Sequence, residues 1–331
     1  MKLIIQIPCY NEEKTLPEVV ADLPREIEGI DTIELLVIDD GSRDRTIEVA
    51  RNLGVHHILP MGSNRGLAVA FLRGIQRCVE LGADLIVNTD GDNQYDGTCI
   101  PDLIRPVAEG RLDIVVGARP IEGIEHFSWS KKKLQQIGSR VVRQFSGTDI
   151  PDTTSGFRAY SAEAAMKLHV FNRYTYTLET IIQAGHMDLR IGHMPIRVNA
   201  KTRESRLISS IPRYVRRSAS IILRSYITYK PLRTFLYCSV VPGLLGLALC
   251  IRYLFFFFSG RGGGHLQSLL LAAILLIMMF LLWVLGILAD LISANRKLIQ
   301  EQLYLSRRVH LSQTAEGSVQ DGANETKGQK A

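Results

Sequence analysis

The chain has 331 residues, of which 46% are hydrophobic and 22% charged, and its formal net charge is +6. This composition excludes an intrinsically disordered chain, because it supplies enough apolar side chains to bury a core. The basic residues are concentrated: residues 201–233 contain nine Lys or Arg and one acid, Glu204. The five cysteines show no paired spacing, so we expect a reducing compartment without a disulfide framework or a cysteine metal site.

The first two hundred residues alternate short apolar runs with segments of helical periodicity. This βαβα pattern predicts an α/β fold with a mainly parallel sheet flanked by helices. The predicted strands cover residues 3–7, 33–38, 55–59, 85–89, 114–118 and 189–198. The predicted helices cover residues 13–23, 44–53, 65–81, 100–108, 131–145 and 177–184, and residues 149–160 are predicted to form a polar loop rich in turns.

Three of the predicted strands end in polar clusters, at residues 8–12, 39–42 and 90–94. Because ligands of open α/β sheets bind outside the carboxyl ends of the strands, we expect these clusters to form one site. Asp90 and Asp92 are two hard oxygen donors on a short loop, and they suit Mg²⁺ or Mn²⁺. A solvated acidic turn has the same sequence, so the motif alone leaves both readings open. We expect Asp40 to contact a ligand and Asp44 to cap a helix.

Two long apolar runs, residues 234–258 and 266–292, follow the basic segment, and no acid occurs between Ser205 and Ala289. Each run is long enough to cross a hydrocarbon core of about 30 Å at about 1.5 Å per residue. The short link between them predicts a hairpin, and the basic flanks predict that both ends face the cytoplasm. Residues 207–226 have amphipathic helical periodicity and suit an anionic leaflet. Nucleic acid is not an expected partner, because the cations adjoin the membrane spans. Residues after about 312 are predicted to be a disordered tail.

Five motifs occur in a characteristic order: IPCYNEE, DDGSRDRT, NRGLAVAFLRGI, DGDNQ and TSGFRAY. As an ordered set covering about residues 3–207, they resemble the family-2 glycosyltransferases, in particular the polyprenyl-phosphate glycosyltransferases of the dolichol-phosphate mannose synthase type. The trailing hairpin resembles the membrane-anchored bacterial and archaeal branch of that group. The resemblance implies a GT-A-type, nucleotide-sugar-binding domain. We therefore expect a catalytic domain over residues 1–205, a juxtamembrane region over 206–233, a transmembrane hairpin over 234–292 and a cytoplasmic tail over 293–331.

The resemblance also implies roles for individual residues. The implied metal ligands are Asp90, Asp92 and Gln94, and the implied cofactor is Mg²⁺ or Mn²⁺. The implied nucleotide contacts are Pro8, Tyr10, Glu12, Asp40, Asp90 and Gly91. The implied phosphate contacts are Arg119, Ser139, Arg203, Ser205 and Arg206. Family members often have Gly-x-Ser-Lys where this chain has residues 203–206, so the role of Arg206 stays open.

The expected catalytic residues are Asp92, Asp152, Arg158 and Arg203. Asp152 either orients the acceptor or sugar, acts as a base, or only orders its loop, and Arg158 could hold an anion beside it. Glu179 with Tyr176 is a weaker candidate for a sugar contact.

We expect a metal-dependent, inverting transfer of one sugar from a UDP- or GDP-linked donor to a polyprenyl phosphate on the cytoplasmic membrane face. A phosphate acceptor is largely anionic at neutral pH and has less need of a base than a hydroxyl acceptor. Transfer to a hydroxyl of a lipid or saccharide is the alternative enzyme, and a non-catalytic, membrane-anchored nucleotide-sugar-binding protein is the alternative of another class. The sequence leaves open the sugar, the donor base, the polyprenol length and whether the chain forms a homo-oligomer.

Overall fold

The structure is a computed structural model that describes residues 1–120, 129–170, 175–187, 189–199, 211–260 and 262–328. The chain divides into two compact units. The first contains Met1–Ile222 together with the chain from Tyr304 onward, and the second contains Leu223–Leu303.

The first unit is built on a seven-stranded sheet with the strand order β3-β2-β1-β4-β6-β5-β7. Strand β6 runs antiparallel to both β4 and β5, and the other neighbouring strands pair in parallel. The sheet is therefore mainly parallel, as the βαβα pattern predicts. Its strands are β1 (Lys2–Cys9), β2 (Thr32–Asp39), β3 (His57–Pro60), β4 (Leu85–Asn88), β5 (Ile114–Ala118), β6 (Arg158–Ser161) and β7 (Ile191–Pro195).

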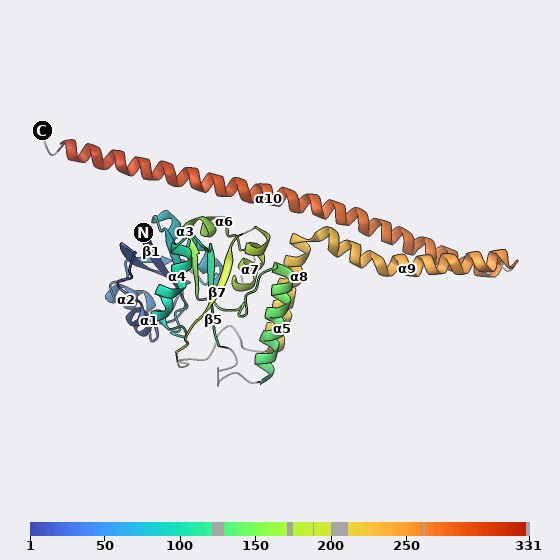
Figure 1. Cartoon of the computed structure of the whole chain (residues 1–331), viewed down its shortest axis with the longest axis horizontal. Helices are drawn as coiled ribbons and strands as arrows, with labels where there is room; N and C mark the ends of the chain where they lie inside the picture. The colour runs from blue at the N-terminus through green and yellow to red at the C-terminus, as the bar shows by residue number, and fades with distance from the viewer. Residues whose placement is uncertain (121–128, 171–174, 188, 200–210, 261, 329–331) are drawn as a thin grey trace. The chain divides into compact units, whose positions relative to one another are not determined.

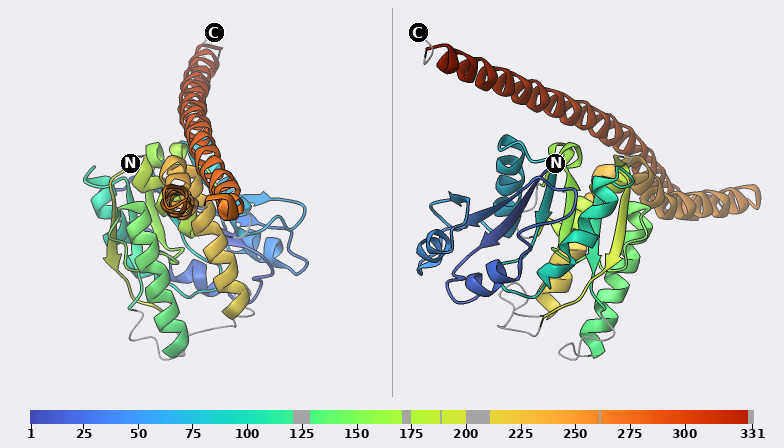
Figure 2. Two further views of the ribbon diagram at one scale, coloured as in Figure 1. Left: turned by 90° about the vertical axis from the view of Figure 1, so that its right-hand side faces the viewer. Right: turned by 60° about the vertical axis from the view of Figure 1, so that its left-hand side comes forward.

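Helices line both faces of this sheet (Figure 1), and the turned views in Figure 2 show the strands between them. Alternate residues of β1 face opposite cores, which explains why its central residues are apolar without alternation apart from the buried Gln6. Leu3 and Ile5 pack with α1 and α4, whereas Ile4 packs with α3, α6 and α7. The helices of this unit are α1 (Leu16–Asp22), α2 (Thr46–Asn52), α3 (Leu67–Glu80), η1 (Gly97–Cys99), α4 (Ile100–Ala108), α5 (Trp129–Ser146), α6 (Ala162–Lys167), α7 (Thr177–His186) and most of α8 (Ile211–Tyr229).

The structure corrects the predicted loop over residues 149–160. Its last residues begin strand β6, which lies between β4 and β5 in the sheet. The strand is short, and its first residue, Arg158, is a charged side chain that is nevertheless fully buried. A local hydrophobic pattern does not reveal such a strand, because the burial of an arginine depends on distant partners.

The second unit contains two long apolar helices that confirm the predicted hairpin. They are α9 (Pro231–Phe258) and α10, which begins at Leu266 after the short helix η3 (Gly262–His265). By length and composition both could cross a membrane. Within the hairpin, Trp283 donates a hydrogen bond to the Ser239 hydroxyl at 2.8 Å. Gly246 has no side chain where α9 meets Leu276, so the two helices can approach closely.

Helix α10 continues to Gly328, through the tail that we predicted to be disordered. Extending an existing helix needs no new nucleus, so residues of moderate helix propensity can be added to it. The sequence shows the polar composition of this tail but not the helix that precedes it.

Candidate active site

The predicted site lies where the strand order reverses. The chain passes from β1 to β2 and β3 on one side, and β4 then pairs with the other edge of β1. Such a switch point opens a crevice outside the carboxyl ends of the strands, which is where open α/β sheets bind ligands. The three polar clusters that follow β1, β2 and β4 meet at this position.

Hydrogen bonds join the loop after β1 to the loop after β2. Asn11 has a positive φ of 57°, and its backbone N–H donates to the Ser42 hydroxyl at 2.9 Å. Its side-chain oxygen accepts from the Arg43 N–H at 2.8 Å, and the Glu12 N–H donates to the Thr46 hydroxyl at 2.8 Å. These contacts fix the backbone that carries Pro8, Tyr10 and Glu12.

Asp40 and Asp44 both order the backbone that follows the carboxyl end of β2. The Asp40 carboxylate accepts the N–H groups of Arg65 at 2.7 Å and Gly66 at 2.9 Å, just before α3. Burial raises the pKa of Asp40, and these two hydrogen bonds oppose the increase. Asp44 accepts the Thr46 N–H at 3.0 Å in the turn before α2, but the N-cap residue of that helix is Arg45, so Asp44 orders the turn and is not the predicted cap. A carboxylate has about four lone-pair sites, so Asp40 can accept a ligand hydrogen bond as well.

The loop after β4 carries the predicted metal ligands, and contacts with neighbouring residues fix the conformation of this loop. A Cβ at Gly91 would lie 3.1 Å from the Cys9 sulfur and 3.3 Å from Glu12 Cγ, so a larger residue would force these side chains to shift where the loop approaches β1. The Gly91 carbonyl accepts from the Thr15 hydroxyl at 2.7 Å, and Asp92 Oδ1 accepts from the Gln94 N–H at 3.2 Å.

The donor set of this loop fits Mg²⁺ or Mn²⁺, because carboxylate and amide oxygens are hard ligands. Within the described residues, no three His, Cys, Asp or Glu side chains gather as a metal-binding group. A site of two carboxylates agrees with Mg²⁺ chemistry, in which water and substrate phosphates supply the remaining ligands.

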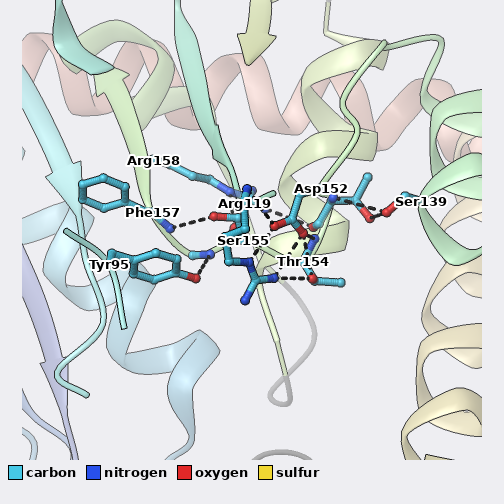
Figure 3. Close-up of polar contacts among 10 residues, drawn as sticks. Tyr95, Arg119, Ser139, Asp152, Thr154, Ser155, Phe157 and Arg158 are labelled. Carbon is cyan, nitrogen blue, oxygen red and sulfur yellow. Dashed lines mark hydrogen bonds and ion pairs between the residues drawn. The ribbon is translucent and has the colours of Figure 1, made fainter. Parts of the chain in front are cut away.

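A second charged group lies beyond the metal loop, at the end of β5 (Figure 3). Arg119 donates to both Asp152 oxygens, from Nε at 2.7 Å and from Nη2 at 3.1 Å. Nη2 also donates to the Thr154 hydroxyl at 2.8 Å. The Asp152 side chain is fully buried and that of Arg119 is 8% exposed. Arg119 makes this pair with one edge of its planar fork, and its Nη1 has no hydrogen-bond partner within the described part of the chain.

The pair changes the acidity of both groups. Burial alone would raise the pKa of Asp152, but the charge and hydrogen bonds of Arg119 outweigh it and lower that pKa below its usual value. Burial would lower the pKa of Arg119, and the Asp152 charge reverses this and raises it. Both groups are therefore ionised at neutral pH.

Comparisons with known proteins agree with this geometry. Residues 4–168 match the family model for glycosyl transferase family 2. The UDP-N-acetylglucosamine–dolichyl-phosphate N-acetylglucosaminyltransferase of Methanococcus voltae is 30% identical over 213 residues, which cover 58% of this chain and 83% of that protein. The chain belongs to glycosyltransferase family 2. The undecaprenyl-phosphate mannosyltransferase of Micrococcus luteus is another relative of this family-2 enzyme, 29% identical over 206 residues, which cover 59% of this chain and 83% of the relative.

Solved structures confirm the fold of the family-2 enzyme. Glucosyl-3-phosphoglycerate synthase from Mycobacterium tuberculosis, in complex with Mn²⁺, UDP-glucose and phosphoglyceric acid, superposes with a TM-score of 0.56. The two chains share 18% identity, and the match covers 68% of this chain and 79% of the other. The GT-A-type architecture predicted from the sequence is thereby confirmed.

Two predicted residues of the family-2 enzyme have structural contacts instead of the expected ligand-facing positions. Arg158 is fully buried, and its guanidinium donates to protein oxygens of Ser155, Thr180, Thr153 and Thr177. We therefore reassign Arg158 from anion binding to support of the loop before β6. Ser139 is 2% exposed, and its hydroxyl lies 3.1 Å from that of Thr153, so it supports the same loop.

The remaining predicted phosphate contacts, Arg203, Ser205 and Arg206, lie outside the described residues. The weaker candidates for a sugar contact, Glu179 with Tyr176, are both buried, and Tyr176 is fully so and does not touch a sugar directly.

The sequence reasoning did not identify Tyr95, which lies between the two charged groups. Its ring stacks on Phe157 with a centroid separation of 5.2 Å, and the Arg119 guanidinium carbon lies 6.0 Å from the Tyr95 ring centre. Its hydroxyl accepts the Gly156 N–H at 2.9 Å. The only signal in the sequence is an aromatic residue directly after the DGDNQ motif.

Proposed function

We propose that this glycosyltransferase moves one sugar from a UDP- or GDP-linked donor to a polyprenyl phosphate, with inversion at the anomeric carbon. The reaction depends on Mg²⁺ or Mn²⁺ and takes place at the cytoplasmic face of the membrane. In this proposal Asp90, Asp92 and Gln94 hold the cation, and the loops after β1 and β2 hold the nucleotide.

The observation that carries the proposal is the position of Asp90 and Asp92 on a hydrogen-bonded loop at the switch point, near the buried Arg119, whose Nη1 has no hydrogen-bond partner among the described residues. Two kinds of relative support it. The proteins from Methanococcus voltae and Micrococcus luteus carry names that specify dolichyl and undecaprenyl phosphate. The synthase from Mycobacterium tuberculosis, which shares the fold, has been solved with Mn²⁺ and a uridine nucleotide.

The chemistry requires stabilisation of charge on the leaving nucleoside diphosphate. When bound, the divalent cation supplies positive charge to the two phosphates as the sugar bond breaks. Asp90 and Asp92 would hold that cation, and Arg119 Nη1 offers two N–H donors to an anionic oxygen. Because the guanidinium is already positioned by Asp152 and Thr154, it reorganises little as charge develops.

The state of Asp152 favours an acceptor that is already anionic. Its carboxylate is fully buried, is bound by Arg119, and has a lowered pKa, and each of these properties makes it a weak base. A phosphate monoester has a second pKa of about 6 and needs little deprotonation at neutral pH. Of the roles considered for Asp152, we therefore propose positioning of Arg119.

In this proposal the membrane hairpin gives the enzyme access to a lipid substrate. Helices α9 and α10 are long and apolar enough to anchor the chain, and the basic residues that flank them favour a cytoplasmic position for both ends. Protease treatment tests this orientation: we expect the catalytic unit to be digested in inside-out vesicles and protected in right-side-out vesicles. The opposite pattern contradicts the proposed orientation.

The central experiment incubates the purified full-length protein with undecaprenyl phosphate, a panel of UDP- and GDP-sugars, and Mn²⁺ or Mg²⁺. We expect lipid-linked sugar with one donor class, no product after chelation, and no product with undecaprenol, which lacks the phosphate. Product formed on undecaprenol instead supports the hydroxyl-acceptor alternative. A protein that binds the donor but forms no product on any acceptor supports the non-catalytic alternative.

The matched variants are Asp92→Ala and Asp102→Ala. Asp92 is a proposed metal ligand, whereas Asp102 forms an exposed surface ion pair with Arg105 on α4. We expect Asp92→Ala to abolish turnover while the protein still folds and inserts, and Asp102→Ala to keep full activity. Turnover that survives both Asp92→Ala and chelation rules out the proposed metal role.

A further inference from the structure

A buried polar network lies directly beneath the proposed metal site and has no role in the function derived so far. Asn88 is the last residue of β4, two positions before Asp90, and it is fully buried. Its side-chain oxygen accepts from Gln6 Nε2 at 2.9 Å. Its Nδ2 donates to the Gly156 carbonyl at 2.8 Å and to the Tyr176 hydroxyl at 2.8 Å. Both N–H donors of this amide and its oxygen are thus engaged, which fixes its orientation.

Hydrogen bonds of the network hold both the carbonyl and the N–H group of Gly156. The Gly156 carbonyl accepts from Asn88 and lies 3.3 Å from the Tyr176 hydroxyl, which donates to it. The Gly156 N–H donates to the Tyr95 hydroxyl at 2.9 Å. Tyr176 is itself held by stacking on Phe71 of α3, with ring centroids 3.7 Å apart and planes within 2° of parallel. Gly156 is therefore a fixed point in the loop that also carries Asp152.

The α-carbon of Gly156 faces the proposed metal ligand. A Cβ on Gly156 would lie 3.0 Å from each Asp90 carboxylate oxygen and 2.8 Å from the Tyr176 oxygen. The Asp90 carboxylate therefore rests against this glycine, and any larger residue would push it away. The same loop holds Arg119 through Asp152 and Thr154, so a shift of Gly156 would alter the spacing between the metal carboxylate and the anion-binding arginine.

We propose that Tyr176 and Asn88 are positioning residues of the transfer reaction. They hold Gly156 in the position against which the Asp90 carboxylate packs. The inference rests on the proposed function, because it assumes that Asp90 binds the divalent cation. Neither side chain touches the substrate. Their effect passes through Gly156 to the direction in which the Asp90 oxygens point, in the way that outer partners of metal ligands set metal affinity.

The experiment measures Mn²⁺ affinity of the full-length protein by electron paramagnetic resonance, in the presence of UDP and separately of GDP. Tyr176→Phe removes only the hydroxyl that donates to Gly156 and accepts from Asn88. We expect its Mn²⁺ affinity to fall about 10-fold, the usual effect of losing such an outer contact. We expect kcat to fall with it and the KM for undecaprenyl phosphate to stay unchanged. Gly156→Ala should weaken Mn²⁺ binding further, because its methyl group displaces Asp90.

Two control variants separate this effect from general damage. Tyr160→Phe removes the hydroxyl of an equally buried tyrosine on β6, which has no hydrogen bond to Asn88 or Gly156 within the described residues. Gly138→Ala adds a methyl group on α5 at a position with no atom within 4 Å. We expect both to bind Mn²⁺ as the wild type does.

The possible results distinguish the two proposals. If the wild type binds Mn²⁺ and transfers sugar while Tyr176→Phe binds Mn²⁺ equally well, the positioning role is overturned and the proposed function stands. If the wild type neither binds Mn²⁺ nor transfers sugar, both proposals fail. A lower melting temperature of Tyr176→Phe with unchanged Mn²⁺ affinity also overturns the positioning role, because it shows a purely structural hydroxyl. If Gly156→Ala does not fold, Tyr176→Phe, which loses one oxygen atom, decides the matter.

Discussion

Asp152→Ala is the most direct test of the buried ion pair. The substitution leaves the Arg119 guanidinium, whose side chain is 8% exposed, without its carboxylate partner. Arg119 keeps its proton in any pH range that the protein tolerates, because the arginine pKa lies above about 12. The variant must therefore bury an uncompensated charge or expose the arginine by moving the end of β5 and the loop before β6.

The expected cost follows from the burial of both partners. Removing one partner of a buried pair costs about 3–5 kcal/mol, whereas losing an exposed pair costs about 0–1 kcal/mol. For a unit of this size each kcal/mol lowers the melting temperature by about 2–4 °C, so Asp152→Ala should lower it by about 6–20 °C.

The assay is thermal denaturation of the full-length protein in detergent, with Asp149→Ala as the matched control. Asp149 also forms an ion pair, with Arg143 at 3.2 Å, but its side chain is 90% exposed. We expect the control to shift the melting temperature by no more than about 4 °C. An Asp152→Ala variant as stable as Asp149→Ala refutes the inference that Asp152 holds a buried arginine.

The pH dependence of the same pair has a definite sign. The pKa of folded Asp152 is lowered, so its carboxylate stabilises the fold above its unfolded pKa, and this contribution is lost as the pH falls through the lower folded pKa. The stability difference between the wild type and Asp152→Asn should therefore be constant between pH 7 and about 5, and should shrink below about pH 4. Chemical denaturation across this range measures it, and a difference that grows below pH 4 contradicts the assignment.

Two further predictions concern the arginines. Arg119→Lys keeps the positive charge but loses the planar guanidinium group. We therefore expect kcat/KM for undecaprenyl phosphate, measured by lipid-linked sugar formation, to fall at least about 10-fold. An unchanged value excludes a phosphate contact through Nη1. Arg158→Met leaves several buried hydrogen-bond acceptors without donors, at a cost of about 1–3 kcal/mol each. We therefore expect denaturation to show a loss of stability of about 3 kcal/mol or more. The KM for the nucleotide-sugar donor should stay unchanged in the folded fraction. An increase in donor KM without a loss of stability would restore the anion-binding role of Arg158.

The sequence predicts the parts of the fold that depend on local burial. Strands β1 and β4 are buried on both faces, so most of their residues are apolar apart from the buried amides Gln6 and Asn88, and the polar residues that follow them mark the switch point. The position of Asp90 and Asp92 follows from that pattern together with the rule for open α/β sheets. Strand β6 was missed because Arg158 is buried by partners at Thr177 and Thr180, which a local window does not contain.

The same limitation applies to the site. A carboxylate before an SGFR motif suggests a functional acid, but the partner of Asp152 is Arg119, 33 residues earlier in the chain. The role of Asn88 depends on Tyr176, 88 residues later. Such pairs are created by the order of strands in the sheet, and a single sequence carries no direct signal of them. Residue types at strand ends thus predict where the chemistry occurs, whereas tertiary contacts determine which side chain touches the ligand.

The environment of Asp152 also bears on the choice between the two acceptor classes. A base that deprotonates a hydroxyl needs an accessible lone pair and a pKa near the working pH. The Asp152 oxygens instead accept from Arg119 Nε and Nη2 and from the Thr154 hydroxyl at 2.9 Å, and its pKa is shifted away from neutrality. If Asp152 were the base, transfer to a hydroxyl would break a buried ion pair in each cycle, at a cost of about 3–5 kcal/mol, which is a rate factor of more than about 100. The proposed transfer to a phosphate leaves the pair intact, and in that proposal Arg119 contacts the acceptor or leaving anion in the geometry that the fold already provides.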